Sequence, residues 1–351
     1  MSEPPRRHDP ANETRHEPRP FVPPVWLRPG IVQTALASQS FRKRGPNPML
    51  DAARDVVLDC GDGVRLKGSF SPHPDNRALV IFLHGWEGSQ DSTYVVSCGR
   101  YMYQRGASVF RLNYRDHGDS HALNEGLFYS TRFNEVFDAV RQAARLGEGA
   151  DVYVVGFSLG GNFALRIARS LRDLMIPKLR RIFAISPVVD PWGAAPLVDA
   201  NPLYRRYFLK KWTASLRKKQ AAFPDLYDFS DLLRERRVLG ITEKILPRHS
   251  RYSRMEDYFN AYRVDPDDLA RVPVPIDIIT ARDDGMIPER DIAGLSLAPG
   301  SRAIIHDHGG HNGFFQSLRG PTWYDEHIAA HVFGDAAGEP ENPVTPASEP
   351  L

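Results

Sequence analysis

The chain has 351 residues, with 45 Lys and Arg against 43 Asp and Glu and a formal net charge of +2 at pH 7. A charge so close to balance argues against a nucleic-acid partner bound across the whole surface. The sequence contains no apolar stretch of about eighteen residues, the length that a membrane-spanning helix needs.

The two ends of the chain differ in composition from the middle. Residues 1–22 are rich in Pro, Arg and Glu, and residues 335–351 are rich in Pro, Ala and Glu. Because neither end has the apolar content needed to pack, we expect both to be disordered tails. They flank one domain over residues 23–334, a length that α/β domains often reach.

Between these ends, β-branched and aromatic runs alternate with amphipathic segments. The runs predict eight strands, near residues 56–60, 65–71, 78–84, 107–114, 151–157, 181–187, 276–281 and 301–306. Helices are expected near residues 90–105, 130–146, 161–173 and 322–333. The turn signal Asp62-Gly63 predicts that the first two strands form a hairpin. The alternation predicts an α/β fold with one doubly wound, mostly parallel eight-stranded sheet.

The third predicted strand ends in a His-Gly loop, His84-Gly85-Trp86-Glu87-Gly88-Ser89. In sheets of this kind that carry a nucleophilic serine, this loop supplies one of two backbone N–H groups that bind an oxyanion, and here it would be that of Trp86. We expect His84 to orient the loop. The next strand is followed by Arg115-Asp116-His117-Gly118-Asp119-Ser120, which we interpret as a turn that braces the oxyanion loop rather than as an acid and base pair.

The fifth predicted strand runs into the most informative motif of the chain, Gly156-Phe157-Ser158-Leu159-Gly160. A strand, a G-x-S-x-G turn and a helix form the nucleophile elbow of an α/β-hydrolase, in which the serine lies in a strained turn. The small Gly156 and Gly160 leave room for the close approach of strand and helix. The N–H of Leu159 would be the second oxyanion donor. We therefore predict Ser158 as a nucleophile.

After the sixth predicted strand, about seventy residues depart from the alternation, longer than an ordinary connection. They predict a helical cap insert at about residues 191–265. Between Tyr204 and Arg254 this insert interleaves Arg and Lys with aromatic residues, a mixture that can contact nucleic acid or an anionic membrane surface. We favour a lid that shields the serine from water, and leave open a peripheral membrane contact through it.

The acid of a triad is expected just beyond the seventh strand, since catalytic residues of open α/β sheets follow the carboxyl ends of strands. Asp283 and Asp284 both lie there. The acid loop of such folds commonly reads D-x-x-x-P, and counting back from Pro288 selects Asp284. We therefore predict Asp284 as the triad acid and Asp283 as a neighbour.

The base is expected after the last strand, in Gly309-Gly310-His311-Asn312-Gly313. The flanking glycines let the imidazole of His311 reach the nucleophile, whereas His306 and His308 are interpreted as structural. Three nearby histidines could also bind zinc, but no second cluster with Glu-x-x-His or Cys spacing completes a coordination shell. We therefore expect no metal and no other cofactor.

Together, these pieces resemble the YheT-like branch of the α/β-hydrolases, which includes bacterial esterases and eukaryotic lipases and acyltransferases. The matching segments are residues 84–89, 156–162, 283–284 and 309–314, and the early segment Arg28-Pro29-Gly30-Ile31-Val32-Gln33-Thr34 is similar to that group's N-terminal signature. The resemblance spans about residues 22–334 and implies the fold and the triad. This chain departs from the group's usual pattern at Ile31-Val32 and Ile241-Thr242-Glu243-Lys244, so it implies no particular substrate.

We therefore expect a serine hydrolase that cleaves carboxylic esters, either lipid-like or of short to medium acyl chain, through Ser158, Asp284 and His311. An acyltransferase that uses an alcohol in place of water has the same triad, and a non-catalytic binding protein can have the same scaffold. The sequence does not predict an oligomeric state. Cys60 and Cys98 are too few for a disulfide framework, and the polar N-terminus lacks the apolar core of a signal peptide, which favours a cytoplasmic location.

Overall fold

The computed structural model describes residues 20–334. The predicted tails lie outside the described residues, apart from residues 20–22 at the edge of the first one. Within those three, the Phe21 ring lies edge-on to His306 with ring centroids 5.1 Å apart.

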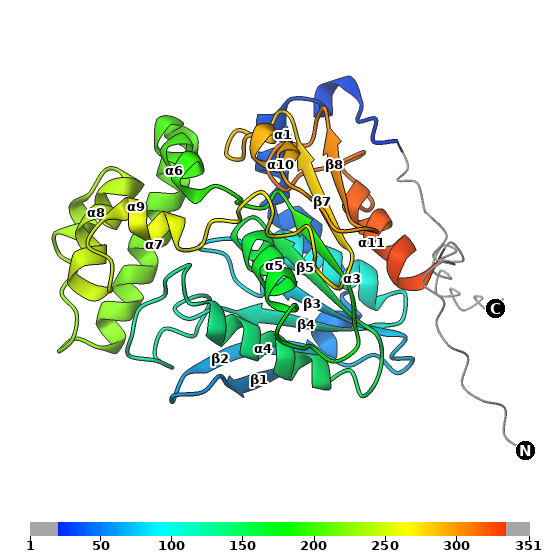
Figure 1. Cartoon of the computed structure of the whole chain (residues 1–351), viewed down its shortest axis with the longest axis horizontal. Coiled ribbons are helices and arrows are strands. Elements are labelled where there is room, and N and C mark those ends of the chain that lie inside the picture. The colour runs from blue at the N-terminus through cyan, green and yellow to red at the C-terminus, as the bar shows by residue number, and fades with distance from the viewer. Residues whose placement is uncertain (1–19, 335–351) are drawn as a thin grey trace, which may run out of the picture.

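One twisted sheet of eight strands forms the centre of the molecule (Figure 1). Its spatial order is β1-β2-β4-β3-β5-β6-β7-β8. β1 is antiparallel to β2, as the predicted hairpin requires. β2 is also antiparallel to β4, and all other neighbours are parallel. The strands are β1 (Arg54–Asp59), β2 (Arg65–Ser71), β3 (Ala78–Leu83), β4 (Ala107–Asn113), β5 (Val152–Phe157), β6 (Leu179–Ile185), β7 (Ile276–Ala281) and β8 (Arg302–His306). The predicted fold class is confirmed.

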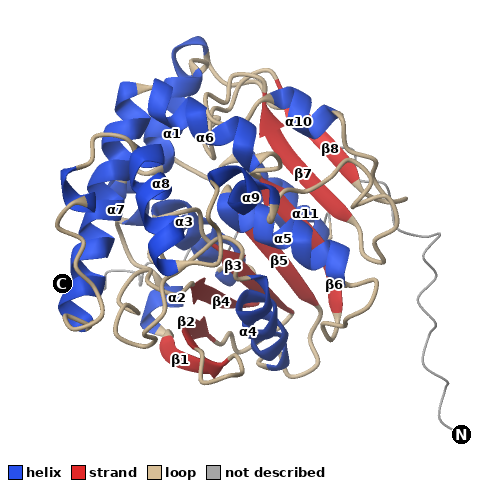
Figure 2. Ribbon diagram, turned by 60° about the vertical axis from the view of Figure 1, so that its left-hand side comes forward, coloured by secondary structure: helices blue, strands red, loops and turns tan. Residues whose placement is uncertain are grey.

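Helices cover both faces of this sheet, as Figure 2 shows. Side chains of a strand alternate between faces, so Leu79 and Ile81 of β3 pack in one apolar cluster while Val80 and Phe82 pack in another. The first cluster includes residues of α4 (Phe133–Arg145) and α5 (Leu159–Ser170), and the second includes residues of α3 (Thr93–Tyr103) and α11 (Trp323–Phe333). Burial on both faces explains why β3 reads as a continuous apolar run.

The segment between β6 and β7 leaves the sheet and folds into a group of helices to one side of it (Figure 1). We call residues 191–265 the cap segment. It contains α6 (Pro191–Ala200), α7 (Pro202–Ala222), a short 3-10 helix η4 (Leu232–Arg234), α8 (Val238–His249) and α9 (Met255–Asn260).

Several short helices were not predicted from the sequence. They are η2 (Val25–Leu27), α1 (Gly30–Ala37), η3 (Ser40–Lys43), α2 (Pro48–Asp51) and α10 (Glu289–Ala293). α1 contains Gly, Ile, Val and Thr, which favour helix weakly, so its helical state depends on packing rather than on propensity. Every helix within residues 20–334 is too short or too polar to span a bilayer.

Candidate active site

Ser158 occupies the sharp turn between β5 and α5. Its backbone has φ 55° and ψ −114°, a conformation that L residues rarely adopt. A Cβ atom added to Gly156 would lie 2.2 Å from the carbonyl oxygen of Gly160, and one added to Gly160 would lie 2.1 Å from that of Leu83. The backbones therefore approach so closely that only glycine fits at both positions, and the predicted elbow geometry is present.

Asp284 and His311 meet beyond the ends of β7 and β8. The His311 Nδ1 lies 2.8 Å from Asp284 Oδ2, and both residues are buried. The other carboxylate oxygen, Oδ1, accepts the backbone N–H groups of Met286 at 2.8 Å and Ile287 at 3.1 Å. Because a carboxylate only accepts, the neutral ring carries its proton on Nδ1, which leaves Nε2 as a proton acceptor.

Asp283 has a different partner from its neighbour. Its Oδ1 accepts the N–H of Gly310, at 2.8 Å, in the loop that carries His311. Burial raises the pKa of the Asp283 carboxyl. The two adjacent carboxyls therefore have different partners. Asp284 contacts the His311 imidazole, and Asp283 contacts the backbone N–H of the preceding residue, Gly310.

The other two histidines of this region lie in different surroundings from His311. The His306 ring stands edge-on to Trp323 with centroids 4.3 Å apart, and burial lowers its pKa to about 4. His308 is more exposed, with Nδ1 3.8 Å from Asp283 Oδ2. The three rings therefore do not converge on one point where a metal ion could bind.

Ser158 and His311 both line one cavity, together with Trp86 and Leu159. Its volume is about 160 Å³. A Cβ added to Gly85 would lie 3.3 Å from Ser158 Cβ, so the His-Gly loop passes directly beside the serine. Within residues 20–334, neither the Trp86 nor the Leu159 N–H donates a hydrogen bond to another protein group. Two residues that line the cavity with Ser158 thus each have a backbone N–H that is not used by another protein group within the described residues.

The loop that carries Trp86 is braced by two buried histidines. The Glu87 N–H donates to His117 Nε2 at 3.2 Å, and His117 Nδ1 donates to the Arg115 carbonyl at 2.7 Å. Burial lowers the pKa of His117 to about 4, so its ring is neutral at pH 7 and can accept this bond. His84 Nδ1 lies 2.7 Å from the Gly85 carbonyl. The bracing interpretation of both segments is confirmed.

The cap segment forms much of the cavity wall. Phe208 of α7 stacks on the Trp86 ring with centroids 5.1 Å apart, and Trp212 meets the same ring edge-on at 5.0 Å. The rest of the lining is mainly apolar and comes from the core and all four cap helices; it includes Leu127, Phe128, Val188, Ala194, Val198, Leu216, Val238, Leu239, Ile245, Leu246, Phe259, Met286 and Ile287.

A buried ion pair that the sequence did not predict attaches α7 to the rest of the domain. Lys219 Nζ lies 2.8 Å from Asp116 Oδ1 and also donates to the carbonyls of Asn124 at 2.5 Å and Gly126 at 3.2 Å. Lys219 is only 1% exposed. It follows two other basic residues in the sequence, a pattern that normally indicates a solvated face, so no local signal marked it as buried.

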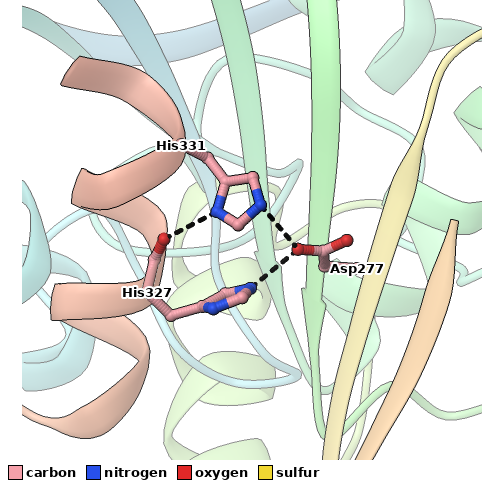
Figure 3. Close-up of side chains that lie close together, drawn as sticks. All are labelled: Asp277, His327 and His331. Carbon is pink, nitrogen blue, oxygen red and sulfur yellow. Dashed lines mark hydrogen bonds and ion pairs between the residues drawn. The ribbon is translucent and has the colours of Figure 1, made fainter. Parts of the chain in front are cut away.

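A cluster of Asp277, His327 and His331 lies close enough together to hold a metal ion (Figure 3). The His327 Nε2 is 2.7 Å from Asp277 Oδ2, and His331 Nε2 is 3.6 Å from the same oxygen. However, Arg181 and Arg302 also contact Asp277 Oδ1, at 2.8 Å and 3.3 Å. Two guanidinium groups already neutralise this carboxylate and repel a cation. We interpret the cluster as a structural network that holds α11 on β7.

With the fold and this site described, the class of the protein follows: the chain belongs to the alpha/beta hydrolase family, whose model matches residues 80–319. Among curated proteins, it is similar to mouse monoacylglycerol lipase ABHD2, with 22% identity over 350 residues that cover 89% of this chain and 79% of that protein. Human monoacylglycerol lipase ABHD2 is 21% identical with the same coverage.

Solved structures share the fold. A hyperthermophilic esterase from Pyrobaculum calidifontis has a TM-score of 0.51 and 18% identity, covering 86% of this chain and 90% of that one. A serine hydrolase from the polyaromatic-hydrocarbon-degrading bacterium Cycloclasticus zankles has a TM-score of 0.53 and 12% identity, covering 82% of this chain and 100% of that one.

Proposed function

We propose that this protein is a serine hydrolase that cleaves carboxylic esters, with Ser158 as nucleophile, His311 as base and Asp284 as its orienting acid. The observation that carries the proposal is that Ser158 and His311 line the same cavity while the His311 Nδ1 lies 2.8 Å from Asp284 Oδ2. Esterase and lipase relatives support ester hydrolysis as the reaction class.

In the proposed reaction, His311 Nε2 accepts the Ser158 proton while Oγ attacks the ester carbonyl carbon. Negative charge develops on the carbonyl oxygen, and the Trp86 and Leu159 N–H groups donate to it. His311 then gives its proton to the leaving alcohol, which leaves an acyl group on Ser158. Water, deprotonated by the same ring, attacks this acyl group and releases the acid and the free serine. Asp284 holds the Nδ1–H tautomer throughout and stabilises the imidazolium.

The cavity indicates which acyl groups to test first. Its lining is mostly apolar, and a volume of about 160 Å³ is close to that of the roughly 150 Å³ cavity known to hold benzene. As it stands, the cavity therefore accommodates a short acyl group, and a longer chain requires the cap segment to move. Because the similar mouse and human proteins are monoacylglycerol lipases, glycerides are the second class to test.

A panel of p-nitrophenyl esters and monoacylglycerols, measured with wild type and Ser158→Ala, tests the proposal. We expect turnover of at least one ester by wild type and a loss of about a thousandfold or more in the variant. Adding alcohol acceptors to the same assays detects acyl transfer, for which nothing in the site gives separate support. Equal turnover by both proteins would contradict the proposal.

We also propose that the cap segment contacts anionic lipid. α7 carries seven Arg and Lys and no acidic residue over Pro202–Ala222, and near its start Leu203 is 64% and Tyr207 44% exposed. Basic and apolar side chains on one helix are typical of contact with an anionic bilayer surface. We expect co-sedimentation with phosphatidylglycerol vesicles but not with phosphatidylcholine vesicles.

Two charge-reversal variants, one on α7 and a control on α4, sharpen this lipid experiment. Arg206→Glu with Lys210→Glu on α7 should abolish vesicle binding, whereas Arg145→Glu on α4 should leave it unchanged. Binding that all three proteins share would contradict a contact through α7.

We further propose that the chain belongs to the YheT-like branch of the α/β-hydrolases. This proposal rests on the motifs at residues 84–89, 156–162, 283–284 and 309–314.

Both cysteines, Cys60 and Cys98, are free and buried. The expected cytoplasmic location stays a prediction.

A further inference from the structure

The N-terminal segment Arg28-Pro29-Gly30-Ile31-Val32-Gln33-Thr34 has no part in the chemistry described above, yet it lies against the loop that carries His311. Its last five residues, from Gly30 to Thr34, form the first part of α1, and the two segments are more than 270 residues apart in the sequence. The contact is close, because a Cβ added to Gly310 would lie 2.2 Å from the Gly30 carbonyl oxygen.

Thr34 makes the most direct contact with this loop. Its Oγ1 accepts the backbone N–H of His311 at 2.8 Å and donates its own proton to the Gly30 carbonyl at 2.8 Å. The donated bond orients the hydroxyl, so its lone pair is directed at the His311 amide. The backbone position of His311 is therefore set by a side chain of α1.

Gln33 joins α1 to the same loop a few residues further on. Its Oε1 accepts the N–H of Phe315 at 2.7 Å, and its Nε2 donates to the carbonyls of Phe315 at 3.1 Å and Leu27 at 2.8 Å. Gln33 is fully buried. A buried amide with three partners is costly to remove, because each partner would lose its hydrogen bond away from water.

Asp283 contacts both this loop and α1. It accepts the Gly310 N–H, and a Cβ added to Gly30 would lie 2.3 Å from the Asp283 carbonyl oxygen. The consecutive amides of Gly310 and His311 are thus held by Asp283 and Thr34. α1 is in contact with both the acid loop and the histidine loop.

We propose that α1 is a positioning element for His311, in which Thr34 is the positioning residue and Gln33 anchors the helix to the loop. The inference rests on the proposed role of His311 in ester hydrolysis. A base displaced by about 1 Å from its reacting partner typically loses up to a hundredfold in rate. The loss of rate should appear in kcat rather than in KM, because no residue of α1 lines the cavity.

The test compares Thr34→Val, which keeps the shape and removes the hydroxyl, with Thr34→Ser, which keeps the hydroxyl. We expect kcat to fall about 10- to 100-fold in Thr34→Val, KM to change less than about threefold, and Thr34→Ser to recover most of the rate. Thr34→Ala removes the same hydroxyl and replaces Thr34→Val if that variant does not fold.

Thr213→Val is the matched control. Thr213 Oγ1 donates to the Leu209 carbonyl one helical turn earlier, as Thr34 does to Gly30, but on α7 and away from the His311 loop. We expect its kcat to stay near that of wild type. A kcat within twofold of wild type for Thr34→Val would overturn the inference, and so would a Thr34→Ser variant as slow as Thr34→Val. If Ser158→Ala and His311→Ala also retained turnover, the proposed function itself would fail.

Discussion

At the scale of single residues, the site separates side chains that are adjacent in the sequence. Asp284 contacts the His311 ring, whereas Asp283 holds the Gly310 amide. The motif D-x-x-x-P selected the first of these two acids, and the structure gives the physical reason for the difference. Only the Asp284 side chain is turned towards the ring, while its other oxygen is held by two backbone amides.

The three histidines of this region give a direct prediction. His311→Ala removes the proposed base and should lower kcat/KM for an ester substrate by about three orders of magnitude or more, whereas His308→Ala should change it little. Steady-state kinetics with one p-nitrophenyl ester suffices, with melting temperatures to show that both variants fold. A larger loss in His308→Ala would refute the assignment of the base.

Glu87 gives a prediction about pH. Burial raises the pKa of its carboxyl to about 8 from 4.5, and although Lys211 opposes the shift, Asp116 adds to it. Between these values the carboxyl ionises in the unfolded chain but stays protonated in the folded one, so Glu87 destabilises the fold increasingly as pH rises from about 4.5 to 8.

The neutral variant Glu87→Gln removes this penalty. Its melting temperature should exceed that of wild type, and this difference should be larger at pH 8.5 than at pH 5 by at least about 2 °C. Differential scanning calorimetry at the two pH values measures the margin. A constant margin, or one that shrinks as pH rises, would contradict a raised pKa for Glu87.

At the scale of elements, the strands were predictable and the short helices were not. β3 and β5 are buried along their whole length, so their apolar runs stand out in the sequence. α1 has only eight residues and few strong helix formers, and it is stabilised by contacts with the acid and histidine loops. Contacts between such distant segments leave no periodic pattern, which is why sequence analysis could not find them.

The attachment of α7 provides a prediction about stability. Lys219→Met removes the cation and leaves Asp116 buried without it, so the free energy of unfolding should fall by about 3–5 kcal/mol. Lys244→Met is the matched control, because Lys244 pairs with Glu235 at the surface and its loss should lower the free energy of unfolding far less than the loss of Lys219. Urea unfolding followed by circular dichroism measures both, and equal losses would show that the buried pair contributes no more than the exposed one.

At the scale of the whole molecule, the sheet brings together groups that lie far apart in the chain. Ser158 follows β5, Asp284 follows β7 and His311 follows β8, and the parallel arrangement of these strands places all three at one edge. The local motifs selected each residue as a candidate, and the alternation of strands and helices predicted that all three follow the carboxyl ends of strands in one sheet. The contacts of Thr34 and Gln33 with the histidine loop, and of Lys219 with Asp116, depend on the tertiary fold and required the structure.

The central claim is that Ser158 is a nucleophile activated by His311. A fluorophosphonate probe tests it most directly, because serine Oγ displaces fluoride from phosphorus only when a base accepts its proton. We predict one covalent adduct on wild type, located on Ser158 by peptide mass spectrometry, and its loss in Ser158→Ala and in His311→Ala. An unlabelled wild type, or an adduct that persists in Ser158→Ala, would contradict the account.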